Sequence, residues 1–369
     1  MINRILTLIW KELLAVLRDR KVRISILVPP IIQLFVFTFA STLDVKNVTI
    51  GILNRDNGEQ GIEFVERFYG TRVFSHVIFL KGVEEIGPFM DEQKGLMVVS
   101  LDEQFSRNLD AKKPASVQLI LDGRKSNTAQ IVAGYVASII SQFNDDVSAE
   151  LQIKQQNTRL IGRNWFNPNL LYYWYNIPCL VGVLSMLTCL VVTTQSIARE
   201  KELGTFDQLL VSPLVPREIL IGKIVPGIII GMFEGLFMLT MGTLILGVPF
   251  TGSLLLYTLS LFVFVASISG IGLFISSLSS SQQQAMLGTF VFMMPSILLS
   301  GFATPIENMP TWLQPITYLI PLKYMLIISK GLFLKAMPAS IVLNNVWQMA
   351  LIAVCTIYGA GAFFRRRLG

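Results

Sequence analysis

The chain has 369 residues, of which 52% are hydrophobic and only 15% are charged. Soluble proteins average about 25% charged residues, so this composition argues against an ordinary soluble enzyme and against a disordered chain. The formal net charge is +6. Because the cations flank apolar stretches, they indicate membrane topology and not nucleic-acid binding.

The charged residues are unevenly distributed along the chain. Residues 44–163 hold 14 of the 30 basic and 16 of the 24 acidic residues. Between Ile224 and Leu322 the only charged residues are Glu234 and Glu307. Three stretches carry no charge at all: 24–43, 164–198 and 336–364. The sequence therefore combines membrane-type segments with one polar domain.

The N-terminal region predicts an interfacial helix followed by a first membrane span. Apolar residues recur at helical spacing over 3–20, which suits a helix lying at a membrane surface, so 1–23 is assigned as a cytoplasmic amphipathic segment. Residues 24–43 are long enough to cross a bilayer and contain Pro29–Pro30, which favours an uncleaved span over a signal peptide. Six Lys and Arg against two acids in 1–23 place this end in the cytoplasm by the positive-inside rule.

Residues 44–168 predict an extracytoplasmic α/β domain. Strand patterns alternate with helix patterns, and the last helix extends from Ser126 to about Gln156. The strands are expected at Val48–Leu53, Val73–Leu80, Leu96–Leu101 and Val117–Leu121, and the other helices at Glu59–Tyr69, at Val83–Gln93 and from Asp102 to Leu109. The single histidine, His76, is interpreted as a strand or surface residue.

Residues 169–369 predict five further spans, which completes an α-helical multi-pass membrane protein of six spans. They are expected at Leu171–Ser196, Leu220–Leu246, Ser253–Leu278, Gln284–Phe302 and Asn345–Phe364. Three arginines after the last span place the C-terminus in the cytoplasm as well. The proline-rich stretch 303–334 is interpreted as outer re-entrant or interfacial helices; the alternative is a seventh span. All three cysteines, Cys179, Cys189 and Cys355, lie in apolar spans, and no metal site is predicted.

The third predicted span contains a repeat of glycines and one acidic residue. Gly227, Gly231 and Gly235 recur every four residues and predict a groove for close helix packing. Glu234 is a carboxylate within an apolar span, where charged groups are costly and usually face a cavity or a partner. It is either a proton or cationic-substrate site on the transport pathway, or a packed and hydrogen-bonded carboxyl group.

The cytoplasmic loop 197–220 is the most specific feature of the sequence. Gly204 is suited to end one helix and Thr205 to cap a short second one, while Phe206, Leu209 and Leu210 form an apolar stripe ahead of Pro213. The segment Glu202-Leu-Gly-Thr-Phe-Asp-Gln-Leu-Leu-Val-Ser-Pro resembles the signature loop of ABC type-2 transporter permeases. Asn167–Pro168, Leu299-Ser-Gly, Pro305 and Met309–Pro310 resemble the same family, especially its bacterial multidrug exporters.

This resemblance implies the transmembrane subunit of an ATP-driven exporter, with Thr205–Val211 as the coupling helix. The implied partners are a cytoplasmic ABC ATPase, a second permease chain in a homodimer or heterodimer, the lipid bilayer and a periplasmic membrane-fusion adaptor. The chain itself has no P-loop, since its only Gly-Lys pair, Gly222–Lys223, is followed by Ile224. It is therefore not expected to be an enzyme or to hold a cofactor, and ATP and Mg would bind to the partner. Drug-like or hydrophobic and lipidic compounds are the implied cargo, and the bacterial inner membrane is the implied location.

The implied site residues fall into two further groups. Glu200, Lys201 and Glu202 are expected either to pair with charges of the ATPase or to form a solvated helix end. The outer gate candidates are Pro305, Pro310, Trp312, Pro315 and Tyr318.

Two other functions stay open: an ion-driven secondary transporter that uses Glu234, and a membrane receptor that signals from its outer domain. Inverted repeats would favour the secondary transporter, and a cytoplasmic output domain would favour the receptor. The sequence contains no convincing instance of either feature.

Overall fold

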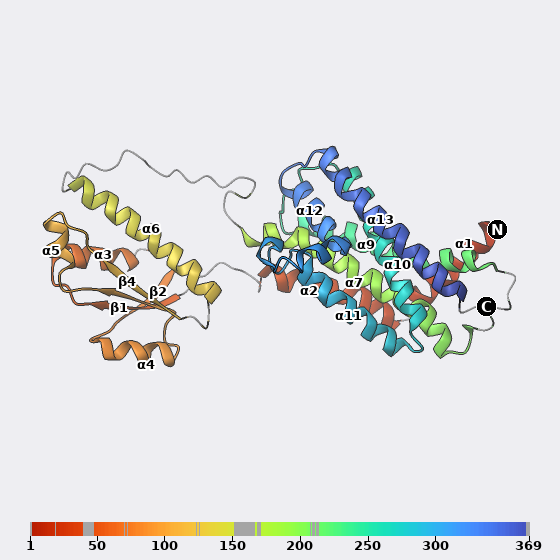
Figure 1. Ribbon diagram of the computed structural model, residues 1–369, viewed down its shortest axis with the longest axis horizontal. Helices are drawn as coiled ribbons and strands as arrows, with labels where there is room; N and C mark the ends of the chain where they lie inside the picture. Colours follow the sequence, from red (N-terminus) through yellow and green to blue (C-terminus); the bar gives the residue numbers. More distant parts are fainter. Residues whose placement is uncertain are drawn as a thin grey trace. The chain divides into compact units, whose positions relative to one another are not determined.

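The computed structural model describes residues 2–18, 20–39, 48–69, 71, 73–122, 124, 126–150, 167, 171–206, 208, 211 and 214–366. By its internal contacts the chain separates into two compact units, Thr42–Gly162 and the remainder, Met1–Ser41 with Arg163–Gly369 (Figure 1).

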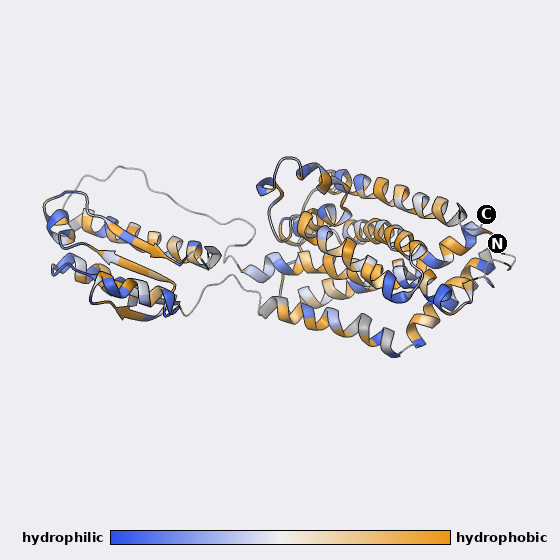
Figure 2. Cartoon of the chain, turned by 60° about the horizontal axis from the view of Figure 1, so that its bottom comes forward, coloured by the Kyte–Doolittle hydropathy of each residue, from blue (hydrophilic) through white to orange (hydrophobic). Residues whose placement is uncertain are grey.

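The larger unit is built from helices. Four of the described helices are long and apolar enough to cross a membrane, namely α7, α9, α10 and α13. In Figure 2 the helices of this unit are coloured mostly as hydrophobic residues. The helices of this unit are α1 (Ile2–Arg18), α2 (Arg20–Phe39), α7 (Tyr172–Glu202), α9 (Pro216–Leu244), α10 (Leu254–Leu278), α11 (Gln282–Leu299), α12 (Pro321–Leu334) and α13 (Ala339–Arg366), with two 3-10 turns, η3 (Ile306–Asn308) and η4 (Gln314–Leu319).

These bounds agree with the helical segments expected from the sequence. A helix covers each predicted apolar segment within the described residues, and α1 covers the amphipathic N-terminal region. The largest differences are at α13, which begins at Ala339 and not at Asn345, and at α7, which continues past Ser196 as far as Glu202. Its final turns contain Arg199, Lys201 and two glutamates. These charged residues set the end of the predicted membrane span, but the helix itself continues through them. The stretch 303–334 forms η3, η4 and the short, mostly buried α12.

Helix α7 lies at the centre of the helical unit. Its side chains are buried on nearly every face, and it packs against α2, α9, α10, α11 and α12. Helix α10 in turn packs against α13 along much of its length. Helix α1 packs against α9, where Gly222 leaves room for the side chain of Leu8, because a Cβ at that position would overlap Leu8. The amphipathic helix is therefore attached to the bundle through its apolar face.

The smaller unit contains a four-stranded sheet in the order β2-β1-β3-β4. Strand β1 pairs in parallel with both β2 and β3, and β4 runs antiparallel to β3. The strands are β1 (Val48–Asn54), β2 (Phe74–Phe79), β3 (Met97–Leu101) and β4 (Val117–Leu121); the helices are α3 (Glu59–Tyr69), η1 (Val83–Glu85), α4 (Ile86–Asp91), α5 (Phe105–Asp110) and α6 (Ser126–Glu150). The strand positions expected from alternation agree with these to within a few residues, and the part of the last predicted helix beyond 150 lies outside the described residues.

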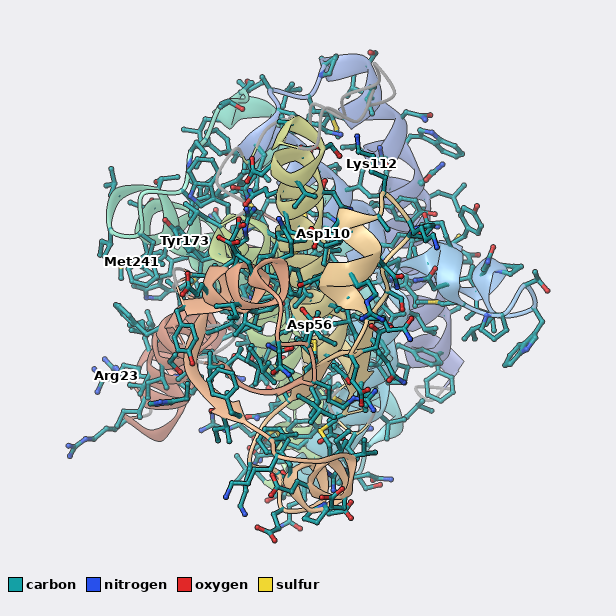
Figure 3. All side chains as sticks on the ribbon, turned by 90° about the vertical axis from the view of Figure 1, so that its left-hand side faces the viewer. Arg23, Asp56, Asp110, Lys112, Tyr173 and Met241 are labelled. Atoms are coloured by element: carbon teal, nitrogen blue, oxygen red, sulfur yellow. The ribbon has the colours of Figure 1, made fainter. Side chains whose placement is uncertain are left out.

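Each face of this sheet has its own apolar core. On one face Phe64, Phe105 and Phe143 bring α3, α5 and α6 together, with ring centroids 5.1–6.1 Å apart. On the other face Phe89 of α4 packs with Leu53, Leu80 and Val98. Asp56, labelled in Figure 3, follows β1 and accepts hydrogen bonds from the Ser106 hydroxyl and the Gly58 amide, which joins the end of β1 to α5. His76 is exposed on β2.

Candidate transmission site at the end of helix α7

Helix α7 ends at a glycine C-cap, from which the chain enters the following loop. Gly204 has a φ of +69°, a conformation that favours glycine, and its amide donates to the Lys201 carbonyl. The Thr205 amide donates to the Glu200 carbonyl at 2.9 Å. This pair of hydrogen bonds is a Schellman motif, so Gly204 ends the helix as its position in the sequence predicts.

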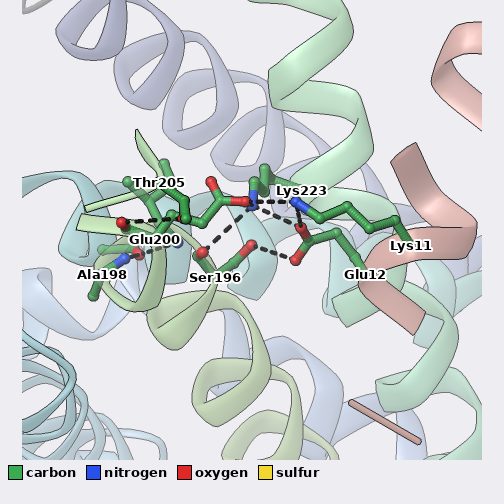
Figure 4. A network of polar contacts seen from close by, with 9 residues as sticks. Lys11, Glu12, Ser196, Ala198, Glu200, Thr205 and Lys223 are labelled. Carbon is green, nitrogen blue, oxygen red and sulfur yellow. Dashed lines mark hydrogen bonds and ion pairs between the residues drawn. The ribbon is translucent and has the colours of Figure 1, made fainter. Parts of the chain in front are cut away.

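A cluster of four charges lies beside this helix end (Figure 4). The Lys223 ammonium on α9 is 2.7 Å from Glu200 Oε1 on α7 and 2.8 Å from Glu12 Oε1 on α1. Lys11, also on α1, is 3.0 Å from the same Glu200 oxygen. The side chains of Lys223, Glu200 and Glu12 are only 1%, 9% and 14% exposed, whereas that of Lys11 is 57% exposed. Three helices are therefore joined by ion pairs that are largely shielded from solvent.

The electrostatic environment of Lys11 reflects these contacts. Partial burial lowers the pKa of Lys11, but its hydrogen bond to Glu200 and the charges of Glu200 and Glu12 outweigh that effect. The net result is a pKa above the usual value of 10.5. Lys11 is therefore held in its charged form by the cluster.

The next two charges of α7 contact the turn between α10 and α11. The Lys201 ammonium donates to the carbonyls of Ser277 and Ser279, at 2.7 and 3.0 Å, at the C-terminus of α10. A Glu202 carboxylate oxygen accepts the amide of Gln282, the first residue of α11, at 2.7 Å. A cation at a helix C-terminus and an anion at a helix N-terminus both suit the helix dipole. Consecutive residues of α7 thus contact α1, α9, α10 and α11.

The predicted coupling helix is only partly covered by the described residues. Phe206 and Gln208 are helical, and Phe206 packs with Ile197, Ile219 and other apolar residues of the bundle. The Thr205 hydroxyl donates back to the Glu200 carbonyl at 3.4 Å. The predicted coupling residues Leu209, Leu210 and Pro213, together with Asp207 and Ser212, lie outside the described residues.

This charge cluster is not predicted from the sequence. Glu200 and Glu202 are expected there either to pair with charges of the ATPase or to form a solvated helix end, whereas in the structure both have partners within the chain. Lys223 was considered only as part of a failed P-loop match. The available signal was a lysine inside the apolar pattern of a predicted span, since such a cation needs an anionic partner.

The glycines of α9 lie where neighbouring helices come close. A Cβ at Gly227 would overlap Thr193 of α7, and one at Gly231 would lie 2.7 Å from Val265 of α10. At Gly235 it would lie 2.6 Å from Leu261 of α10 and 2.8 Å from Ser185 of α7. Larger residues at these positions would separate α9 from both helices.

Glu234 is buried on the same face of α9. The residue is 1% exposed, and its Oε1 atom has no hydrogen-bond partner among the described residues. A buried carboxyl oxygen without a partner is destabilising. The two alternatives for Glu234, a residue of the transport pathway and a packed carboxyl group, both stay predictions.

The outer gate candidates are exposed and lie in the stretch between α11 and α12. Pro305 precedes η3, Pro315 lies in the first turn of η4, and Pro310 and Trp312 lie between these turns. The ring of Tyr318 lies 3.5 Å from the Lys323 ammonium, which also donates to the Thr317 hydroxyl at 3.1 Å. Lys323, which is only 8% exposed, was not singled out from the sequence. In the part of the chain that the structure describes, no three His, Cys, Asp or Glu side chains are grouped to hold a metal ion.

Together, the apolar bundle and helix α1, which is bound to it by buried charges, define a multi-helix membrane protein. The chain matches the family described as ABC-2 family transporter protein over residues 20–362, and it belongs to that family. It is 44% identical to the probable multidrug ABC transporter permease YbhR of Escherichia coli K12 over the full length of both chains. It is 30% identical to the probable multidrug ABC transporter permease YbhS of the same strain, with 94% of this chain and 93% of YbhS covered. The inner membrane transport permease YhhJ of that strain is 26% identical, with 96% and 93% covered.

Proposed function

We propose that this chain is the permease subunit of an ATP-driven ABC exporter of the bacterial inner membrane. The proposal rests on its family and on one observation, the connection of the last turn of α7 to α1, α9, α10 and α11 immediately before the loop. An ATPase that displaces the loop would move these helices together, because ion pairs and helix-end hydrogen bonds link them. ATP and Mg would bind to that partner subunit, which would hydrolyse the ATP.

The proposed topology has six spans with both termini in the cytoplasm. Helices α2 and α11 would add two spans to the four apolar helices, which places residues 44–168 and the stretch 303–334 on the outer side. The basic residues near both chain ends support this orientation. A second permease chain would complete the transport path, either as a homodimer or as a heterodimer, and a periplasmic adaptor would contact the outer domain.

The proposed cargo is a drug-like, hydrophobic or lipidic compound taken from the cytoplasm or the inner leaflet. YbhR and YbhS are both named probable multidrug ABC transporter permeases, and the apolar bundle is compatible with such compounds. Pro305, Pro310, Trp312, Pro315 and Tyr318 would form the outer gate.

Co-purification tests the proposed ATPase contact. We expect the ATPase subunit to purify with this chain and to be lost on Leu209→Asp, because a charge in the apolar stripe of the loop would disfavour docking. The matched control is Leu244→Asp, which places the same charge at an exposed position at the opposite end of α9. Equal retention of the ATPase by both variants would contradict the role of the loop.

Glu234 supports an alternative, an efflux transporter driven by an ion gradient. Its buried, unpartnered oxygen suits a proton or cation carrier. Under this alternative, efflux would persist without any ATPase and stop when the proton gradient is dissipated. Under the main proposal, Glu234→Gln is expected to change transport of at least one substrate at an unchanged membrane level of the protein. Unchanged efflux of every substrate in this variant would remove Glu234 from the transport pathway.

A further inference from the structure

An open hollow lies between α1 and α7, beside the charge cluster. On α1 it is lined by Thr7, Lys11, Leu14 and Arg18, which recur every three or four residues and so form one stripe along the helix. On α7 it is lined by Arg199. None of these five residues is buried, so the hollow is accessible from the surface.

The charged side chains that line the hollow are cations. They are Lys11, Arg18 and Arg199, and no carboxylate lines the hollow among the described residues. Lys11 is paired with Glu200 at 3.0 Å. The adjoining cavity shares Lys11 and Arg199 and adds Lys223 with two carboxylates, so cations outnumber carboxylates across both spaces. This charge balance favours an anionic ligand, and the planar donor groups of two arginines suit a phosphate.

The apolar side chains around the hollow indicate that the phosphate belongs to a lipid. Trp10 and Leu14 line the same hollow, and Trp10 is 62% exposed. Leu6 and Leu17 of α1 are exposed as well. Exposed Trp and Leu side chains beside Lys and Arg are typical of a helix at the level of the lipid head groups. A soluble anion would leave these apolar side chains in water, whereas the acyl chains of a phospholipid would cover them.

We propose that this hollow binds the head group of an anionic phospholipid. The phosphate lies between Arg18 of α1 and Arg199 of α7, Lys11 adds a third positive charge, and the acyl chains contact Trp10. Because Arg199 directly precedes Glu200, the bound lipid joins α1 to α7 next to the ion pairs that already join them. This binding site goes beyond the proposed transport function and does not depend on it, since no ATPase takes part.

The experiment uses the full chain in phosphatidylcholine vesicles that contain a trace of a photoreactive lipid with a diazirine in one acyl chain. Three probes share that chain and differ in the head group: phosphatidylglycerol has a net negative charge, whereas phosphatidylcholine and phosphatidylethanolamine are neutral overall. Labelling of the peptides of α1 is measured by mass spectrometry. We expect phosphatidylglycerol to label them about tenfold more than either neutral probe, because each cation at an anionic membrane surface contributes a factor of about five.

Matched variants separate this site from the general attraction of a basic segment to an anionic membrane. Arg18→Gln and Arg199→Gln are each expected to lower the preference about fivefold. Arg20→Gln removes the same charge from an exposed residue that does not line the hollow, and it is expected to keep the preference. Equal labelling by the three probes, the same loss from Arg18→Gln and Arg20→Gln, or a preference that survives Arg199→Gln would each overturn the proposal. The preference is a ratio of probes on one variant, so it does not depend on how much folded protein each variant yields.

Inorganic phosphate distinguishes a lipid from a soluble anion. It is added at the same bulk concentration as the lipid and at constant ionic strength. We expect the labelling preference to stay unchanged, because free phosphate has no acyl chain to contact Trp10. A preference that disappears on this addition would assign the hollow to a soluble anion and overturn the lipid site.

Discussion

Lys223 and Lys11 provide a direct test of whether the charge cluster holds α1, α7 and α9 together. Both lysines contact Glu200 and Glu12, but the Lys223 side chain is 1% exposed and the Lys11 side chain is 57% exposed. The same substitution, lysine to methionine, therefore removes the same charge from the same partners in two different environments. The comparison isolates the effect of burial.

The expected magnitudes differ because of this burial. Lys223→Met removes the buried cation from the Glu200 and Glu12 carboxylates and leaves them only the largely solvated Lys11. Breaking a buried ion pair in this way costs about 3–5 kcal/mol in the free energy of unfolding. Lys11→Met removes a largely solvated partner, and such pairs contribute about 0.2–1 kcal/mol. In the double variant Lys223→Met/Glu200→Leu most of the loss should be recovered, because neither of these two charges then remains buried without a partner.

The assay is unfolding of the purified chain in detergent micelles by titration with SDS, followed by tryptophan fluorescence. The free energies of the variants are compared at the same micelle composition. If both single variants lose less than about 1 kcal/mol, the cluster does not hold the helices together, and the reasoning from burial is wrong. A double variant as unstable as Lys223→Met alone would also refute it.

Three further predictions follow from the same structure. Gly231→Leu should lower the free energy of unfolding by about 1–3 kcal/mol because the side chain would overlap α7 and α10, whereas Gly359→Leu, where a Cβ meets no atom within 4 Å, should have little effect in the same SDS titration. Gly204→Ala should cost about 1–2 kcal/mol, since its φ of +69° is unfavourable for a residue with a Cβ; an unchanged unfolding curve would refute the strain. The pKa of Lys11 is raised in the folded protein, so its stabilisation is fully present below about pH 10.5 and is lost as pH rises through the folded-state pKa. The stability difference between the unmodified chain and Lys11→Met should therefore shrink above that pH, and a difference that grows there would contradict the assigned sign.

The positions of the helices could be predicted from the sequence because the apolar segments are long and nearly free of charge. A helix crossing a membrane satisfies its backbone hydrogen bonds internally, so length and hydropathy largely define it without reference to other segments. The strands of the smaller unit were found for a similar local reason, namely alternation bounded by turn residues. Gly204 was recognised as a helix end because its conformation depends only on neighbouring residues.

The partners of Glu200, Lys201 and Glu202 were decided by the tertiary structure alone. These three charges are adjacent in sequence, but they contact residues between 23 and 189 positions away. No periodic pattern encodes such pairs, because they depend on which helices pack side by side and on how far each one is rotated. The low charge content indicated a membrane protein from the start, and charged groups buried in an apolar bundle are costly unless they have partners. Only the packing of α1, α9, α10 and α11 around the end of α7 showed what those partners are.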